Sequence, residues 1–138
     1  MSTTIETSTD AIADAGVRSI RVLIVDDADT IRVLLRGMLK NAAGVEVVGE
    51  AGDGAEAIEL ARQLQPDVVL MDVTMPVMDG IEATAVIVEE LPQARVLGLS
   101  ISKDSETAAA MVDAGAAEYL TKGGVAADLI AAVRGRPR

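Results

Sequence analysis

The chain has 138 residues, 50% of them hydrophobic, and a formal net charge of −10. This length predicts one domain, and the negative charge argues against direct binding of nucleic-acid phosphates. The absence of cysteine and histidine excludes disulfides, thiolate chemistry, histidine general bases and imidazole metal sites. Any chemistry must therefore use carboxylates, hydroxyls, lysine or the backbone.

The polar N-terminus, rich in Ser and Thr, lacks the cationic start and continuous apolar core of a signal peptide. We predict a disordered tail over residues 1–17, a folded domain over 18–135 and a short tail over 136–138. No stretch of the sequence is apolar enough to span a membrane, and the lack of cysteine suits a reducing compartment. We therefore expect a cytoplasmic protein that does not contact membranes.

From residue 19 the hydrophobic pattern alternates between two periods. Short apolar runs predict strands, and helical spacing predicts a helix after each. The strands are expected over 20–25, 45–51, 67–71, 95–99 and 117–121, and the helices over 29–42, 54–64, 80–91, 104–115 and 125–135. In the first helix the core-facing stripe is expected to be Ile31, Leu34, Leu35, Met38 and Leu39. This alternation predicts an α/β fold with a five-stranded parallel sheet and helices on both faces.

Polar residues follow four of the predicted strands. In open parallel sheets, ligands bind beyond the carboxyl ends of the strands, so these residues are expected to converge on one edge: Asp26, Asp27, Asp72, Ser100 and Lys122. At such an edge Asp72 need not be buried.

An isolated Asp after a strand is more often a helix N-cap, and Asp29 and Asp79 are interpreted in that way. The adjacent Asp26 and Asp27, joined by Asp72 from another strand, would repel one another and require a cation. Oxygen ligands of high negative charge favour a hard divalent ion such as Mg²⁺, or Mn²⁺.

Four segments together resemble the CheY-like receiver domain of response regulators, over residues 20–134. They are "LIVDDADTIRVLL", "VVLMDVTMPVMDG", "VLGLS" and "AGAAEYLTK". A fifth segment, "VVGEAGDGAEAIELA", is most similar to receivers that precede a helix-turn-helix effector. The resemblance implies a flavodoxin-like (βα)5 fold and a role in two-component signalling.

The resemblance also implies roles for individual residues. Asp72 would accept a phosphoryl group from the phosphohistidine of a sensor histidine kinase or a histidine phosphotransfer protein. Mg²⁺ would be held directly by Asp27, Asp72 and the backbone carbonyl of Thr74, with Asp26 acting partly through water. Lys122 and Ser100 would contact the phosphoryl group, with Ser100 and Tyr119 acting as the switch pair. The surface over residues 104–134 would then bind a downstream protein or a second copy of the chain.

Three positions depart from the common pattern of the family or modulate it. Gly123 follows Lys122 where many relatives have proline, which predicts a more mobile loop. Ile101 follows Ser100 where many relatives have a small residue, which predicts slower access to the phosphoryl group. Thr74 stands where side chains influence the lifetime of the phosphoryl group.

The sequence leaves several functions open. The chain ends at "RPR" with no helices to read a DNA groove, so we expect a stand-alone receiver, the alternative being a piece of a longer chain. A phosphorylation-independent interaction module is the second function to consider. A phosphohydrolase is disfavoured because no second acid lies two residues after Asp72. A dinucleotide-binding domain is disfavoured because no glycine-rich fingerprint follows the first strand. The expected protein acts on itself and is not an enzyme that turns over a substrate.

Overall fold

The computed structural model describes residues 19–73, 75, 78–100 and 105–135. Strands and helices alternate through these residues, and all of the strand pairs are parallel. The strands are β1 (Ile20–Val25), β2 (Val45–Ala51), β3 (Val68–Asp72), β4 (Arg95–Ser100) and β5 (Glu118–Thr121). The helices are α2 (Asp29–Lys40), α3 (Gly54–Leu64), α4 (Gly80–Glu90), α5 (Ser105–Ala114) and α6 (Ala126–Arg134).

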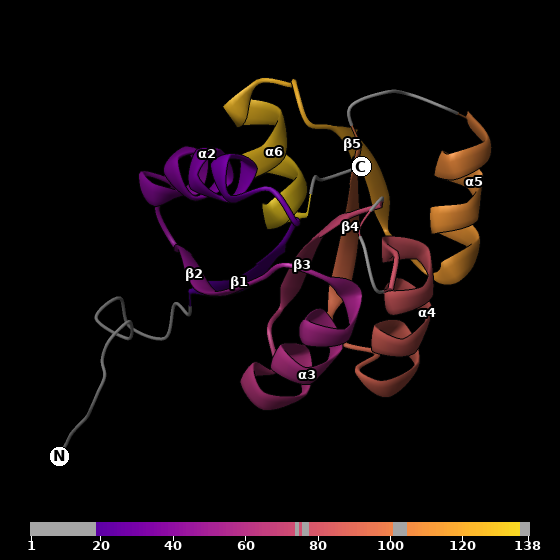
Figure 1. Cartoon of the computed structure of the whole chain (residues 1–138). Helices are drawn as coiled ribbons and strands as arrows, with labels where there is room; N and C mark the ends of the chain where they lie inside the picture. The colour runs from indigo at the N-terminus through magenta and orange to yellow at the C-terminus, as the bar shows by residue number, and fades with distance from the viewer. Residues whose placement is uncertain (1–18, 74, 76–77, 101–104, 136–138) are drawn as a thin grey trace, which may run out of the picture.

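The strands form one sheet in the order β2-β1-β3-β4-β5, with α2 and α6 on one face and α3, α4 and α5 on the other (Figure 1). This confirms the predicted five-stranded parallel sheet covered on both faces. The chain moves outwards from β1 to β2 and then returns past β1 to β3, which creates a topological switch point between β1 and β3.

Alternating side chains of the strands divide the core into two hydrophobic layers. In β1, Leu23 and Val25 belong to the layer under α3, α4 and α5, whereas Val22 and Ile24 belong to the layer under α2 and α6. Every residue of β3 is buried, because this strand lies at the centre of the sheet and both of its faces are covered. The apolar run before Asp72 therefore reflects burial on both sides.

The N-termini of two helices test the predicted caps. Asp79 caps α4 as predicted, since its carboxylate accepts a hydrogen bond of 2.9 Å from the N–H of Glu82. The prediction that Asp29 caps α2 was wrong: the N-cap is Ala28, and Asp29 is the first helical residue. Asp29 instead forms an ion pair with Arg32, one turn along the helix.

The predicted apolar stripe of α2 is also only partly correct. Leu35 and Leu39 are buried, but Leu34 is 49% exposed. Successive helical residues are separated by about 100°, so Leu34 turns away from the sheet when Leu35 faces it. The helix ends at Lys40, two residues earlier than the sequence pattern predicts.

Candidate functional site

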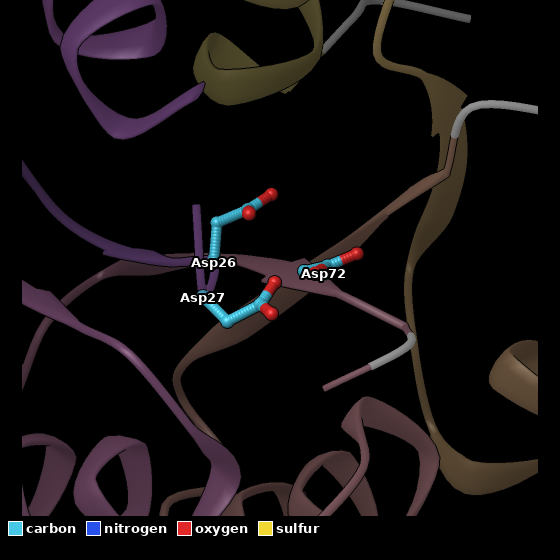
Figure 2. Close-up of side chains that lie close together, drawn as sticks. All are labelled: Asp26, Asp27 and Asp72. Atoms are coloured by element: carbon cyan, nitrogen blue, oxygen red, sulfur yellow. The ribbon is translucent and has the colours of Figure 1, made fainter. Parts of the chain in front are cut away.

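Three carboxylates meet at the switch point of the sheet. Asp26 and Asp27 directly follow β1, and Asp72 is the last residue of the neighbouring strand β3. Figure 2 shows the three side chains close together at the ends of β1 and β3. One carboxylate oxygen from each lies within 4.8 Å of the others. The structure thus brings together the three acids that the sequence placed at one edge.

Asp26 and Asp72 are far more buried than the sequence suggested. They are two of the three buried polar residues in the described part of the chain, with exposed fractions of 0% and 3%. The expectation that Asp72 need not be buried was therefore wrong. β3 continues through Asp72, which lies opposite Leu99 of β4, so neighbouring strands enclose this position on both sides. Asp27, in contrast, is exposed.

The two oxygens of the buried Asp26 carboxylate have different partners. Its Oδ1 accepts a hydrogen bond of 2.9 Å from the N–H of Ala28, which closes a local turn of the Asx type. Its Oδ2 forms an ion pair with Lys122, 2.8 Å from Nζ, but has no partner with hydrogen-bond geometry among the described residues. The side chain of Asp26 therefore holds both the turn after β1 and the lysine that arrives from β5.

Lys122 is the cation of the site. It follows the end of β5, and its backbone N–H donates a hydrogen bond of 2.7 Å to the carbonyl of Ser100 at the end of β4. From there the side chain reaches across β4, so that Nζ lies 3.0 Å from Oδ1 of Asp72. Its side chain is 13% exposed. One ammonium thus bridges two buried carboxylates from separate strands.

Burial and the neighbouring charges shift the pKa values of Asp72 and Lys122. Burial raises the pKa of the Asp72 carboxyl above its ordinary value; the bond from Lys122 opposes this rise, and the charges of Asp26 and Asp27 add to it. Burial acts to lower the pKa of Lys122, but Asp26 and Asp72 outweigh it and the pKa is raised. Lys122 therefore stays charged near neutrality, while burial makes ionisation of Asp72 less favourable than in water.

The donor set fits a hard divalent cation. All three candidate ligands are carboxylates, which are the ligands Mg²⁺ and Mn²⁺ prefer. Three carboxylates lie together, and one ammonium, that of Lys122, pairs with two of them, Asp26 and Asp72. Asp27 and Asp72 are the better direct ligands, because Oδ1 of Asp26 accepts the hydrogen bond from Ala28 and its Oδ2 is in an ion pair with Lys122. The fourth predicted ligand, Thr74, lies outside the described residues.

The predicted switch pair lies on strands β4 and β5. Ser100 ends β4, half-buried, one residue beyond the position level with Asp72. Tyr119 is half-buried, and its ring packs on the core layer under α3, α4 and α5. A Cβ atom built on Gly98 would lie 3.0 Å from Cδ1 of this ring. The hydroxyl of Tyr119 is buried, with no hydrogen-bond partner among the described residues.

Two further residues support the site, and the second of them, Arg32, was missed in the sequence. Gly80, the first residue of α4, packs so closely under β3 that an added Cβ would lie 2.0 Å from the carbonyl oxygen of Asp72. Arg32 of α2 donates a hydrogen bond to the backbone carbonyl of Asp26. Gly80 is the last residue of the segment "VVLMDVTMPVMDG", which carries part of the family resemblance, whereas the sequence gives no signal that distinguishes Arg32 from an ordinary polar helix residue.

A parallel sheet in the order β2-β1-β3-β4-β5, with three carboxylates and a lysine at its switch point, defines an α/β domain of the flavodoxin-like class. Residues 22–134 match the family described as the response regulator receiver domain, so the chain belongs to that family. Response regulators act in two-component signalling, and their receiver domains bind Mg²⁺ in an acidic pocket and partner with histidine kinases or phosphotransfer proteins.

Relatives of known name support this assignment. Response regulator GacA of Pseudomonas viridiflava is 42% identical over 115 residues, which cover 83% of this chain and 54% of that protein. The transcriptional regulatory protein LiaR of Bacillus subtilis is 43% identical, with the same coverage of each chain. The chain spans about half the length of these relatives, 54% in each case.

Solved structures agree on the fold. The response regulator domain of Thermotoga maritima CheB superposes with a TM-score of 0.78 and 34% identity, covering 85% of this chain and 95% of that one. A complex of CheX, CheY, BeF3 and Mg from Borrelia burgdorferi matches with a TM-score of 0.79 and 28% identity, covering 90% and 95% of the respective chains. No helix in the described part of this chain is both long and apolar enough to cross a membrane.

Proposed function

We propose that Asp72 accepts a phosphoryl group from a phosphohistidine on a partner histidine kinase or phosphotransfer protein. The observation that carries this proposal is the ammonium of Lys122, 3.0 Å from Asp72 and 2.8 Å from Asp26, beside the exposed Asp27. The chain contains no histidine, so the phosphohistidine must belong to the partner.

In this reaction a carboxylate oxygen of Asp72 attacks phosphorus. The phosphorus–nitrogen bond breaks, its electron pair leaves with the imidazole of the partner, and an acyl phosphate forms on Asp72. Lys122 is already within ion-pair distance of the attacking carboxylate, so its ammonium can move onto a phosphoryl oxygen without crossing the site. Ser100, at the adjacent strand end, would donate its O–H to another phosphoryl oxygen.

Asp27 and Asp72 would hold Mg²⁺ directly, with Asp26 beside them and the backbone carbonyl of Thr74 as a further ligand. When bound, the ion supplies positive charge that offsets the charge on the transferring phosphoryl group. The structure of the Borrelia burgdorferi relative that includes BeF3 and Mg supports this proposal by analogy.

The proposed output is a change in the protein-binding surface over residues 105–134, the described part of the predicted 104–134 surface. Two of its apolar side chains are largely exposed, Val112 at 54% and Val125 at 63%. Movement of Ser100 towards the phosphoryl group, with a shift of Tyr119, would alter this surface and select a downstream protein or a second copy of the chain.

A phosphorylation-independent interaction module is the second candidate function. It requires the same fold but no use of the acidic site. The phospho-switch is favoured because Asp26, Asp27, Asp72 and Lys122 are all present and assembled at one place.

Intact-mass measurement after incubation with acetyl phosphate tests the proposal. We expect the wild type to gain one phosphoryl group in Mg²⁺ and none in EDTA. Asp72→Asn should gain none, and the control Asp113→Asn, at an exposed position of α5, should behave as the wild type. Labelling of Asp72→Asn at the wild-type rate would place the acceptor elsewhere. A wild type that is labelled neither by acetyl phosphate nor by a panel of phosphorylated histidine kinases would favour the interaction module.

A further inference from the structure

Arg32 of α2 connects the acidic turn after β1 (residues 26–29) to the neighbouring strand β2. Its guanidinium donates to the backbone carbonyl of Asp26, to the carboxylate of Asp29 and, at 3.1 Å, to Oε1 of Glu50 in β2. The Arg32 side chain is 17% exposed. A guanidinium is a rigid planar fork with several donors, so one side chain can hold all three acceptors in a defined arrangement.

We propose that Arg32 is a positioning residue that holds residues 26–29 in the geometry needed for Mg²⁺ and thereby sets the affinity of the site for this ion. The inference deepens the proposed function and rests on it for the identity of the metal. It concerns the backbone of the turn, since Arg32 contacts the carbonyl of Asp26 and leaves the carboxylate of Asp26 to Ala28 and Lys122.

The contacts of the turn show why Arg32 matters for Asp27 in particular. Before Asp27, the N–H of Asp26 donates a hydrogen bond of 3.0 Å to the carbonyl of Ala51 in β2. After Asp27, the N–H of Ala28 is bound to the Asp26 carboxylate. Arg32 holds the carbonyl of Asp26, which belongs to the peptide group that leads into Asp27. The exposed Asp27 carboxylate thus depends on its anchored neighbours for its direction.

The direction in which loss of Arg32 changes the affinity for Mg²⁺ distinguishes a positioning role from a purely electrostatic one. A nearby cation repels Mg²⁺, so the loss of a purely electrostatic Arg32 would strengthen Mg²⁺ binding. Two carboxylates already face this guanidinium, those of Asp29 and Glu50, so little of its charge acts on the metal site. Loss of a positioning residue weakens binding instead, because the ion must then order the turn. Removing groups that orient metal ligands typically lowers metal affinity by about 10- to 100-fold.

Arg36 provides a matched control. It lies one turn further along α2 and also forms an ion pair with Glu50, but its side chain is 54% exposed. Arg36→Met removes the same charge and a bond to the same glutamate at a greater distance from the acidic turn. Arg32→Lys is the conservative variant, because its ammonium keeps the charge but lacks the planar fork.

The test measures Mg²⁺ affinity by isothermal titration calorimetry and exchange of the Ala28 amide by NMR in the metal-free proteins. We expect Arg32→Met to raise the dissociation constant at least about tenfold and to speed exchange of the Ala28 amide. Arg36→Met should stay within about twofold of the wild type, and Arg32→Lys should lie between. If Arg32→Met does not fold, the comparison of Arg32→Lys with Arg36→Met decides the question.

A phosphorylation assay distinguishes weaker Mg²⁺ binding from a general loss of stability. The Mg²⁺ concentration required for half-maximal labelling by acetyl phosphate should rise in Arg32→Met, while the rate at saturating Mg²⁺ stays at the wild-type value. Unchanged or tighter Mg²⁺ binding in both Arg32 variants would overturn the positioning role. A weaker Mg²⁺ affinity in a protein that is never labelled would instead support positioning and refute the proposed phosphoacceptor.

Discussion

Lys122 Nζ lies 3.0 Å from Oδ1 of Asp72, and the same nitrogen lies 2.8 Å from Oδ2 of Asp26. One ammonium from the end of β5 thus faces two buried carboxylates from the ends of β3 and β1. The free energy of the metal-free site depends on this arrangement, because a buried carboxylate without a cation is costly.

Removal of the Lys122 ammonium should destabilise the metal-free protein. We expect Lys122→Met to lower the free energy of unfolding by about 1–3 kcal/mol, since hydrogen-bonded charges are left without their partner. Mg²⁺ should recover part of the loss, because it supplies positive charge to the same carboxylates. Urea denaturation with and without Mg²⁺ measures both effects. Lys40→Met, at the exposed end of α2, is the control; an equal loss in both variants would contradict the assigned role of Lys122.

Mg²⁺ should stabilise the folded protein through Asp27. At a free concentration of tenfold its dissociation constant, the ion should add about 1.4 kcal/mol to the free energy of unfolding by mass action. Asp27→Asn removes one negative charge and one ligand, so it should stabilise the metal-free protein and abolish most of the Mg²⁺ increment. Thermal melts in EDTA and in Mg²⁺ report both changes. The same increment in both proteins would show that Asp27 is not a ligand.

The raised pKa of Asp72 makes stability depend on pH. A carboxyl whose pKa is raised on folding stabilises the protein below its ordinary pKa of 3.8, and this contribution is lost as the pH rises through the raised value. Asn cannot ionise at position 72. In EDTA, the free energy of unfolding of Asp72→Asn minus that of the wild type should therefore increase with pH across this window and stay constant above it. Urea denaturation from about pH 3 to 7 measures the difference. A difference independent of pH would mean that the pKa is not raised on folding.

Gly80 should be intolerant of any side chain. An added Cβ would lie 2.0 Å from the carbonyl oxygen of Asp72, and overpacking of this kind costs about 1–3 kcal/mol or more. Gly80→Ala should therefore destabilise the protein and displace the end of β3. Gly37→Ala is a matched control within α2, because no atom other than the nearby backbone of its own helix and its chain neighbours lies within 4 Å of its added Cβ, and alanine favours helix by about 1 kcal/mol over glycine. In denaturation experiments we expect Gly80→Ala to lower the free energy of unfolding and Gly37→Ala to raise it. Equal effects of the two substitutions would contradict the close packing at Gly80.

Occupation of Asp72 should move the ring of Tyr119. The ring already packs against the core near Gly98, and we expect it to rotate further inward when Ser100 moves towards Asp72. The chain has one tyrosine and no Trp or Phe, so tyrosine fluorescence and ring NMR signals need no label. Beryllofluoride with Mg²⁺ imitates the phosphoryl group, and Asp72→Asn supplies the control. Unchanged ring signals at confirmed occupancy would leave rearrangement of the backbone at Ser100 as the route of the switch.

The sequence alone determined the layers of the fold and the edge on which the site lies. Alternation of strand and helix periods requires parallel strands, because each helix carries the chain back to the same end of the sheet. The carboxyl ends of all strands then share one edge, which gathers Asp26, Asp72 and Lys122 whatever the order of the strands. Short, strongly apolar runs such as residues 68–71 made this inference possible.

Tertiary structure decided the burial and the partners of these residues. Asp72 is enclosed because β3 lies between β1 and β4, and the sequence pattern does not specify this order. Lys122 reaches Asp72 across β4, and Arg32 contacts Glu50 of β2, which lies 18 residues further along the sequence. Hydrophobic periodicity reports which face of an element is covered, whereas these polar contacts depend on the lateral order of strands and on the directions of single side chains. These polar contacts form only when the sheet and its helices have assembled.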